Sequence, residues 1–151
     1  MHRLEENPQT PAALLRAAAY NGDSVLVRRL IDEGVDVNVW DNWGRTALSF
    51  ASREGHVEVV RILVTANAWV DPHEDYDTFE TPLIAAAEEG HLEIVKCLIA
   101  AGADPSVHAG VSQGTAEFYA RTNGRSDVAE YLLAQPLGGP SRGGPANGVS
   151  P

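Results

Sequence analysis

Cysteine is almost absent from this sequence, which has a single one at position 97. One thiol cannot form an intrachain disulfide, and this suits a reducing compartment such as the cytoplasm. Long apolar runs are also missing, since no stretch approaches the ~18 apolar residues of a membrane-spanning helix. Residues 1–8 are polar and contain no apolar core of a secretory signal. These absences favour a cytoplasmic chain over a secreted or membrane protein.

Positive charge is scarce as well. The 11 Lys and Arg residues are outnumbered by 21 Asp and Glu residues, which gives a formal net charge of −10. A surface that binds nucleic acid needs basic side chains to neutralise phosphates, so this composition argues against DNA or RNA as the partner. It argues equally against anionic membrane surfaces and favours a protein partner that carries a basic patch.

What the sequence does contain is an internal repeat. Gly22, Gly55, Gly90 and Gly124 lie 33, 35 and 34 residues apart. Alignment on these glycines brings three further columns into register, nine and four residues before the glycine and eight residues after it. The columns are Ala13, Thr46, Thr81 and Thr115; Ala18, Ala51, Ala86 and Ala120; and Leu30, Leu63, Leu98 and Leu132. Agreement of several independent columns indicates a repeat architecture rather than chance.

The residue types within each repeat predict two short helices joined by a turn. Thr46 and Thr81 suit the N-cap position, where a hydroxyl accepts a hydrogen bond from a free backbone N–H. Pro82 suits the first helical position, where its missing N–H costs nothing. Gly55 and Gly90 suit the residue with positive φ that ends a helix.

The apolar positions of the second helices predict which side is buried. These helices are expected within residues 57–63, 92–99 and 127–133, and Val59, Ile62 and Leu63 follow the spacing of one helix face. Cys97 occupies the same stripe one repeat later. We therefore expect its thiol to be buried in the core and inert, because a reactive thiol needs an electropositive, partly exposed setting.

Residues 80–104 and 44–60, which contain these caps, glycines and stripes, resemble the consensus of the ankyrin repeat family. The resemblance covers roughly residues 10–135. It implies an all-α ankyrin-repeat solenoid of about four helix-turn-helix repeats, with β-hairpin-like finger loops and a concave groove formed by the fingers and the first helices. The first and last units depart from the motif, with Ala13 in place of threonine and Glu117 in place of leucine.

The chain is accordingly divided into three parts. Residues 1–9 form an N-terminal segment, and residues 10–135 form the repeat domain, with units at about 10–40, 41–75, 76–109 and 110–135. Residues 136–151 contain five glycines and four prolines. Such a segment cannot bury enough apolar area to offset the entropy of the chain, so a disordered tail is expected.

No catalytic or cofactor motif is visible. The histidines do not follow a metal-site spacing, and the glycines are spread at the repeat spacing rather than clustered into a phosphate-binding loop. His56 and His91 occupy the same column, directly after the glycine. This position favours a histidine that hydrogen-bonds the turn over a metal ligand. The sequence therefore predicts no enzymatic activity, no cofactor and no metal.

The predicted fingers carry aromatic residues, Trp40 and Trp43 in the first and Tyr76 and Phe79 in the second. A turn offers such rings no core, and Trp and Tyr are enriched at the hot spots of protein interfaces. The alternative is that the rings pack along their own fingers and stiffen them. Together with polar neighbours, the candidate partner-binding residues are Trp40, Asn42, Trp43, Arg45, Arg53, Glu54, Asp75, Tyr76, Asp77, Phe79, Glu80, Glu88 and Glu89.

Acidic residues are concentrated beside these aromatics. Residues 71–93 contain eight Asp and Glu residues and no Lys or Arg. The resemblance implies that Glu88 and Glu89 line the concave groove, with Glu54 alongside from the preceding repeat. We expect an acidic groove that attracts a basic protein surface. The alternative is an ordinary solvated charged face.

The leading hypothesis is a monomeric protein–protein interaction module with a basic protein partner. Two alternatives stay open: a stand-alone inhibitor or immunity-type protein that neutralises an enzyme or toxin, and a scaffold fragment of a larger protein. A small-molecule or metal-binding role has no sequence feature in its favour. The fold alone does not choose among these functions.

Overall fold

Paired helices make up the computed structural model, which describes residues 7–72, 80–109 and 112–136. Within these ranges the helices are α1 (Pro11–Asn21), α2 (Ser24–Asp32), α3 (Ala47–Glu54), α4 (Val57–Thr65), α5 (Pro82–Glu89), α6 (Leu92–Ala100), α7 (Ala116–Thr122) and α8 (Ser126–Leu133). The predicted all-α solenoid of about four repeats is confirmed. Residues 137–151 of the predicted tail lie outside the described residues.

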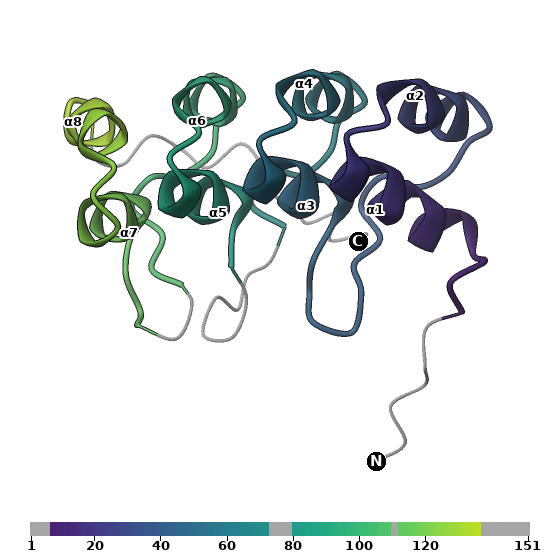
Figure 1. Cartoon of the computed structure of the whole chain (residues 1–151), viewed down its shortest axis with the longest axis horizontal. Helices are drawn as coiled ribbons and strands as arrows, with labels where there is room; N and C mark the ends of the chain where they lie inside the picture. The colour runs from purple at the N-terminus through teal and green to yellow at the C-terminus, as the bar shows by residue number, and fades with distance from the viewer. Residues whose placement is uncertain (1–6, 73–79, 110–111, 137–151) are drawn as a thin grey trace, which may run out of the picture.

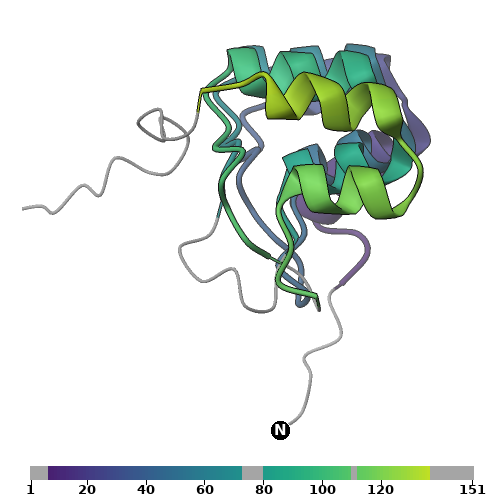
Figure 2. The same cartoon turned by 90° about the vertical axis from the view of Figure 1, so that its left-hand side faces the viewer.

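The helices form two layers (Figure 1). The odd-numbered inner helices lie side by side in one row, and the even-numbered outer helices form the second row. We call the loops that join α2 to α3, α4 to α5 and α6 to α7 the first, second and third fingers, and the first finger, which is described throughout, extends from the inner row (Figure 1). The view turned by 90° shows the described parts of the fingers running beside the inner helices (Figure 2).

Threonine side chains begin the inner helices. Each accepts a hydrogen bond from the backbone N–H three residues further on, at 3.1–3.2 Å, and the four residues are Thr10, Thr46, Thr81 and Thr115. The predicted caps at Thr46 and Thr81 are confirmed. The first repeat differs from the alignment, which placed Ala13 in the threonine column. Helix α1 begins one turn earlier because Thr10 supplies the cap and Pro11 the first helical position.

Glycines at the ends of the inner helices make room for a side chain of the next repeat. Gly55 has a φ of 82°, and a Cβ atom there would lie 2.7 Å from the imidazole of His91. That ring hydrogen-bonds through Nε2 to the carbonyl oxygen of Arg53 at 2.9 Å. His56 makes the same contact with the carbonyl oxygen of Tyr20 at 2.8 Å. The prediction of turn-binding histidines is confirmed, and the turn belongs to the preceding repeat.

A second ladder of hydrogen bonds joins the fingers at their bases. Asn38 Oδ1 accepts from the backbone N–H of Trp69 at 2.8 Å. One repeat later, Asp71 Oδ2 accepts from the backbone N–H of Asp104 at 3.0 Å. Among the described residues, the only β-type pairing is an isolated antiparallel bridge between residues 109 and 114. The described fingers are therefore held by turns and side chains rather than by hairpin ladders.

The core runs along the stack between the two helix layers. Its fully buried side chains include Leu15, Leu48, Leu63, Leu83, Ile94 and Leu98. The prediction that Cys97 is buried in the core is wrong: its side chain packs against the core but is half-buried, like that of Ile62 in the same column. The outer helices contact their neighbours along one side only, so two of the three stripe positions are buried and the third is half-buried. Burial still raises the pKa of the Cys97 thiol, although Arg61 opposes this effect. None of the helices in the described ranges has the length and hydropathy to cross a bilayer.

Candidate functional site

Two clusters of side chains occupy the inner face, which we define as α1, α3, α5 and α7 together with the fingers. The aromatic cleft lies between α1, the first finger and α3, and consists of Arg16, Tyr20, Asp41, Trp43, Arg45 and Phe50. The carboxylate cluster lies between α3, α5 and the second finger, and consists of Arg53, Glu80, Glu88 and Glu89. Side chains from different repeats meet in both.

Asp41 organises the first finger. Its carboxylate is buried and accepts hydrogen bonds through Oδ1 from the backbone N–H groups of Trp43 and Arg45, each at 2.9 Å. Its Oδ2 accepts from Arg45 Nε at 2.9 Å and lies 2.8 Å from Arg45 Nη2. Because one carboxylate ties two backbone groups and one guanidinium, the finger turns back at a defined point and holds Trp43 and Arg45 beside each other.

The guanidinium of Arg45 lies between two aromatic rings. Its Cζ is 5.0 Å from the ring centroid of Trp43 and 4.7 Å from that of Phe50. Both separations fall within the range of cation–π attraction. The Tyr20 ring meets Phe50 edge to face, with centroids 6.1 Å apart. The rings of Trp43, Phe50 and Tyr20 thus provide neighbouring apolar surfaces, and the Arg45 guanidinium lies against two of them.

The cleft beside this row has a volume of about 710 Å³. Trp43 remains 54% exposed and Tyr20 50% exposed, even though both rings have contacts. The alternative that the finger rings only stiffen their own loop therefore accounts for the contacts of Trp43 but not for its exposed half. Half of its surface is available to a partner. Trp40 is 48% exposed, and Asn42 is exposed at the rim of the cleft.

Arg16, Tyr20 and Phe50 were not among the residues predicted from sequence. Arg16 is buried in α1, and its Nη1 donates to the carbonyl oxygen of Val39 at 3.2 Å. Burial lowers the pKa of its guanidinium, while Asp41 opposes the shift and Arg45 adds to it. A signal was present: Arg16 is the single charged residue in a column that otherwise contains Ser49, Ile84 and Phe118.

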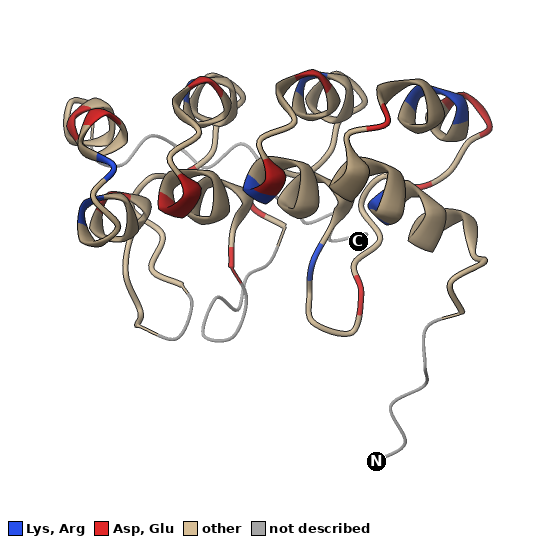
Figure 3. Cartoon of the chain, in the orientation of Figure 1, with Lys and Arg blue, Asp and Glu red and all other residues tan. Residues whose placement is uncertain are grey.

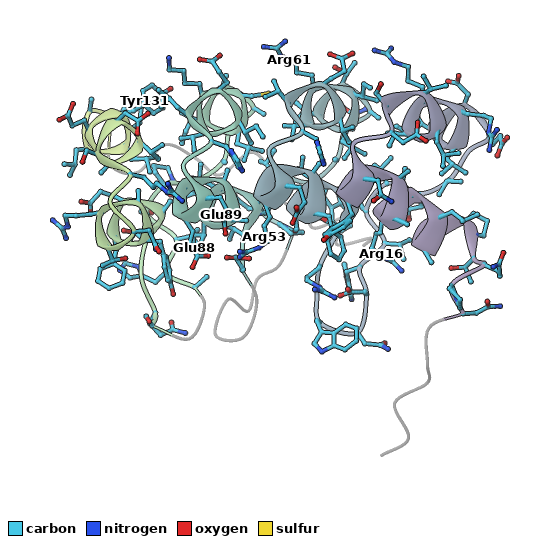
Figure 4. All side chains as sticks on the ribbon, viewed as in Figure 1. Arg16, Arg53, Arg61, Glu88, Glu89 and Tyr131 are labelled. Atoms are coloured by element: carbon cyan, nitrogen blue, oxygen red, sulfur yellow. The ribbon has the colours of Figure 1, made fainter. Side chains whose placement is uncertain are left out.

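Arg53 is the centre of the carboxylate cluster. Its Nη1 lies 3.0 Å from Glu89 Oε1, and its Nη2 lies 3.1 Å from Glu88 Oε2. Nη2 also donates to both carboxylate oxygens of Glu80. All four side chains are half-buried. Figure 4 shows Arg53, Glu88 and Glu89 together where α3 and α5 are neighbours.

Opposing effects set the protonation of this cluster. Burial disfavours the charged guanidinium of Arg53, but its bonds to Glu80 and Glu88 outweigh that effect and raise its pKa. Burial also raises the pKa of Glu80, against the attraction of Arg53. Desolvation and pairing thus act in opposite directions at each of these two groups.

The carboxylates of the predicted acidic groove are partly neutralised by a cation from another repeat. The sequence window 71–93 contains no cation, but Arg53 belongs to the preceding repeat and folds onto three of its carboxylates. Three carboxylates and one guanidinium give the cluster a net charge of −2. The cluster is therefore acidic, but it carries less negative charge than its three carboxylates would alone. Glu54 is exposed at the end of α3. Asp75, Tyr76, Asp77 and Phe79 lie outside the described residues.

The inner face offers charged and aromatic recognition groups. Among the residues whose placement is described, no three His, Cys, Asp or Glu side chains converge as metal ligands would. The groups that do converge are guanidinium, carboxylate and aromatic side chains. These are the groups that fix the orientation of a bound protein or peptide.

Comparison with known proteins agrees with the fold. The family model "Ankyrin repeats (3 copies)" matches residues 3–74 and 67–139. Because these matches cover most of the chain, it belongs to the ankyrin repeat family, whose repeats serve as protein–protein interaction modules.

Individual relatives match over short stretches. The 2-5A-dependent ribonuclease of Mus musculus is 38% identical over 68 residues, which cover 44% of this chain and 9% of that protein. Cortactin-binding protein 2 of Ornithorhynchus anatinus is 41% identical over 61 residues, 40% of this chain and 4% of that protein. L-asparaginase of Dirofilaria immitis is 39% identical over 64 residues, 42% of this chain and 11% of that protein. The chain therefore matches about a tenth or less of the length of these relatives.

Proposed function

We propose that this chain binds a protein partner through its inner face and that the partner presents a basic side chain to the carboxylate cluster. The observation that carries the proposal is the position of Glu88 and Glu89. They end α5 with their carboxylates half-exposed, and Arg53 offsets only one of the three negative charges of the carboxylate cluster, which leaves the cluster with a charge of −2. The side chain of Arg125 also lies beside Glu88, where its Nε donates to the backbone carbonyl oxygen at 3.2 Å. A basic group of a partner would offset part of this negative charge and exclude water from the site.

The half-exposed aromatic rings support the same surface. Trp43 and Tyr20 flank a cleft large enough to take a side chain, and large aromatic rings are frequent anchors of protein interfaces. The outer helices offer less. A smaller hollow of about 400 Å³ lies between α2 and α4, and its lining residues include the charged Arg28, Glu58 and Arg61 but no aromatic side chain. Figure 4 shows Arg61 on the outer row, away from the fingers.

The proposed role is binding without catalysis. The clusters of the inner face are open to solvent, whereas catalysis prefers a closed, water-excluding site. Neutralisation of an enzyme or toxin and scaffolding within a larger protein are both forms of this role. They differ in what the partner is, so identification of the partner decides between them.

The test is capture of partners from a cell lysate with purified full-length chain, read out by mass spectrometry. A Glu88→Gln, Glu89→Gln double variant removes the exposed acids, and Trp43→Ala removes the aromatic anchor. Glu130→Gln serves as the control because Glu130 is exposed on outer helix α8. We expect a basic partner that is retained by the control and lost by both inner-face variants. Retention by both inner-face variants would place the binding surface elsewhere.

A further inference from the structure

The two clusters of the inner face share helix α3. Phe50 belongs to the aromatic cleft and Arg53 to the carboxylate cluster, and the two residues are three positions apart in one helix. Residues at this spacing lie on the same helix face, about 4.5 Å apart along the axis. A single bound segment that crosses α3 would therefore contact both clusters.

The clusters carry opposite charge. The aromatic cleft contains two guanidinium groups, Arg16 and Arg45, and one carboxylate, Asp41, which leaves a net charge of +1. The carboxylate cluster has a net charge of −2. Figure 3 shows the blue and red segments of the first finger and the adjoining ends of α3 and α5 on this side of the molecule. The inner face is therefore bipolar rather than uniformly acidic.

The Arg45 guanidinium is more accessible to a partner than the Asp41 carboxylate. The Asp41 carboxylate is 5% exposed and accepts from two backbone and two guanidinium N–H groups, which occupies its oxygens. The Arg45 side chain is 48% exposed. Its guanidinium carries five N–H donors in a planar fork, and Asp41 engages one edge of the fork. A carboxylate that enters the cleft would meet donors of Arg45 and the faces of Trp43 and Phe50.

From this arrangement we propose that the inner face binds a bipolar peptide segment of a protein partner. An acidic residue with an aromatic or aliphatic neighbour occupies the aromatic cleft, and a Lys or Arg lies against Glu88 and Glu89. Neighbouring helices pack 8–10 Å apart and an extended peptide rises about 3.3 Å per residue, so the two charges are about three residues apart. The inference rests on the proposed function and deepens it by adding an acidic requirement.

The same charges argue against other occupants. A nucleic-acid strand in the aromatic cleft would meet the carboxylate cluster within one helix turn of Phe50, and its phosphates would be repelled there. A small anion would accept hydrogen bonds from Arg45 but would leave the apolar walls of the cleft exposed to water. A peptide segment uses the cation, the rings and the carboxylates together.

The test is selection of random 12-residue peptides displayed on phage against the full-length chain. Enriched peptides are synthesised, and their Kd values are measured by fluorescence anisotropy at two salt concentrations. We expect an acidic and a basic residue separated by about three positions, with an apolar residue next to the acid. Replacement of the peptide acid by alanine should raise Kd about tenfold, the size expected for a charge-assisted hydrogen bond.

A double-mutant cycle assigns the contacts. The variants are Arg45→Gln for the cleft and Glu89→Gln for the cluster, each paired with a peptide that lacks the acid or the base. The loss of affinity on removal of the peptide acid should disappear in Arg45→Gln and persist in Glu89→Gln, and the reverse should hold for the base. A variant that failed to fold would lose the effects of both peptide changes, so persistence of the other effect in each variant shows that the variant is folded.

The outcomes separate the inference from the proposed function. Enriched peptides with basic residues alone, insensitive to Arg45→Gln, would overturn the bipolar site while upholding an acidic binding face. If simultaneous substitution of Arg45, Trp43, Glu88 and Glu89 left peptide binding unchanged, or if no peptide were enriched, both the bipolar site and the proposed function would be overturned. Tighter binding of a single-stranded oligonucleotide or inorganic phosphate than of any peptide would overturn the claim that the inner face binds a peptide.

Discussion

Asp71 lies at the base of the second finger under conditions that disfavour its charge. It is 4% exposed, and its Oδ2 accepts from the backbone N–H of Asp104 while its Oδ1 has no hydrogen-bond partner among the described residues. Burial raises the pKa of Asp71 to about 6, with the Asp104 charge adding to the shift and the hydrogen bond opposing it. One repeat earlier the same position is Asn38, which makes the same bond through its amide oxygen. We therefore examine the substitution Asp71→Asn.

The sign of the effect follows from the direction of the pKa shift. The folded-state pKa, about 6, lies above the ordinary value of 3.8, so the native state binds more protons than the unfolded state between these values. Stability consequently falls as the pH rises from about 4 to about 6. At 1.36 kcal/mol per pH unit, the ionised carboxylate costs up to about 3 kcal/mol at pH 7. An asparagine keeps the acceptor and cannot ionise.

We expect Asp71→Asn to raise the free energy of unfolding by about 2–3 kcal/mol at pH 7 and by little at pH 4. Urea denaturation followed by circular dichroism between pH 4 and 7.5 measures both values. Asp32→Asn is the matched control, because it removes the same charge from the exposed end of α2. A variant that is no more stable than wild type at pH 7, or one that gains equally at pH 4, would refute the reasoning.

Three further substitutions test the contacts between and within repeats. Gly55→Ala should cost about 2 kcal/mol or more, because its Cβ would collide with His91 at a φ of 82°. The matched Gly124→Ala, which has positive φ but no atom within 4 Å, should cost about 1 kcal/mol; equal losses of Tm would contradict the inter-repeat contact. Arg53→Met should destabilise the stack by about 1–2 kcal/mol at pH 7, because it removes the counter-charge of three carboxylates, and by less at pH 4, because burial raises the pKa of Glu80. A pH-independent loss in urea titrations would show that packing rather than charge holds the cluster. Thr10→Ala should cost about 1 kcal/mol if α1 begins at Thr10, and unchanged urea midpoints would restore the later start at Ala13.

Prediction from sequence succeeded where the determinants are local. The threonine caps act on an N–H group three residues away, and the glycines act on their own backbone. Each such rule operates within one turn of helix, so the type and spacing of residues suffice. The caps at Thr46 and Thr81 and the glycine helix ends were accessible in this way, whereas the turn that each histidine binds belongs to the preceding repeat.

Prediction was incomplete where a contact joins different repeats. The window 71–93 appeared free of cations because Arg53, its counter-charge, lies outside it in the sequence. Cys97 was expected in the core because it follows the apolar stripe, but a stripe position at the edge of an outer helix is only half covered. Arg16 was passed over because its neighbours, Val39 and Asp41, come from a finger more than 20 residues away.

By itself, the sequence determined the period of the repeat, the pairing of short helices and the points where each inner helix begins and ends. Only the tertiary structure decided that Arg53 binds three carboxylates, that Arg45 lies between Trp43 and Phe50, and that Asp71 titrates near pH 6. The reason is physical. Helix formation depends on neighbours along the chain, whereas the charge and exposure of a binding surface depend on which atoms meet once stacking of the repeats brings together residues 27–36 positions apart.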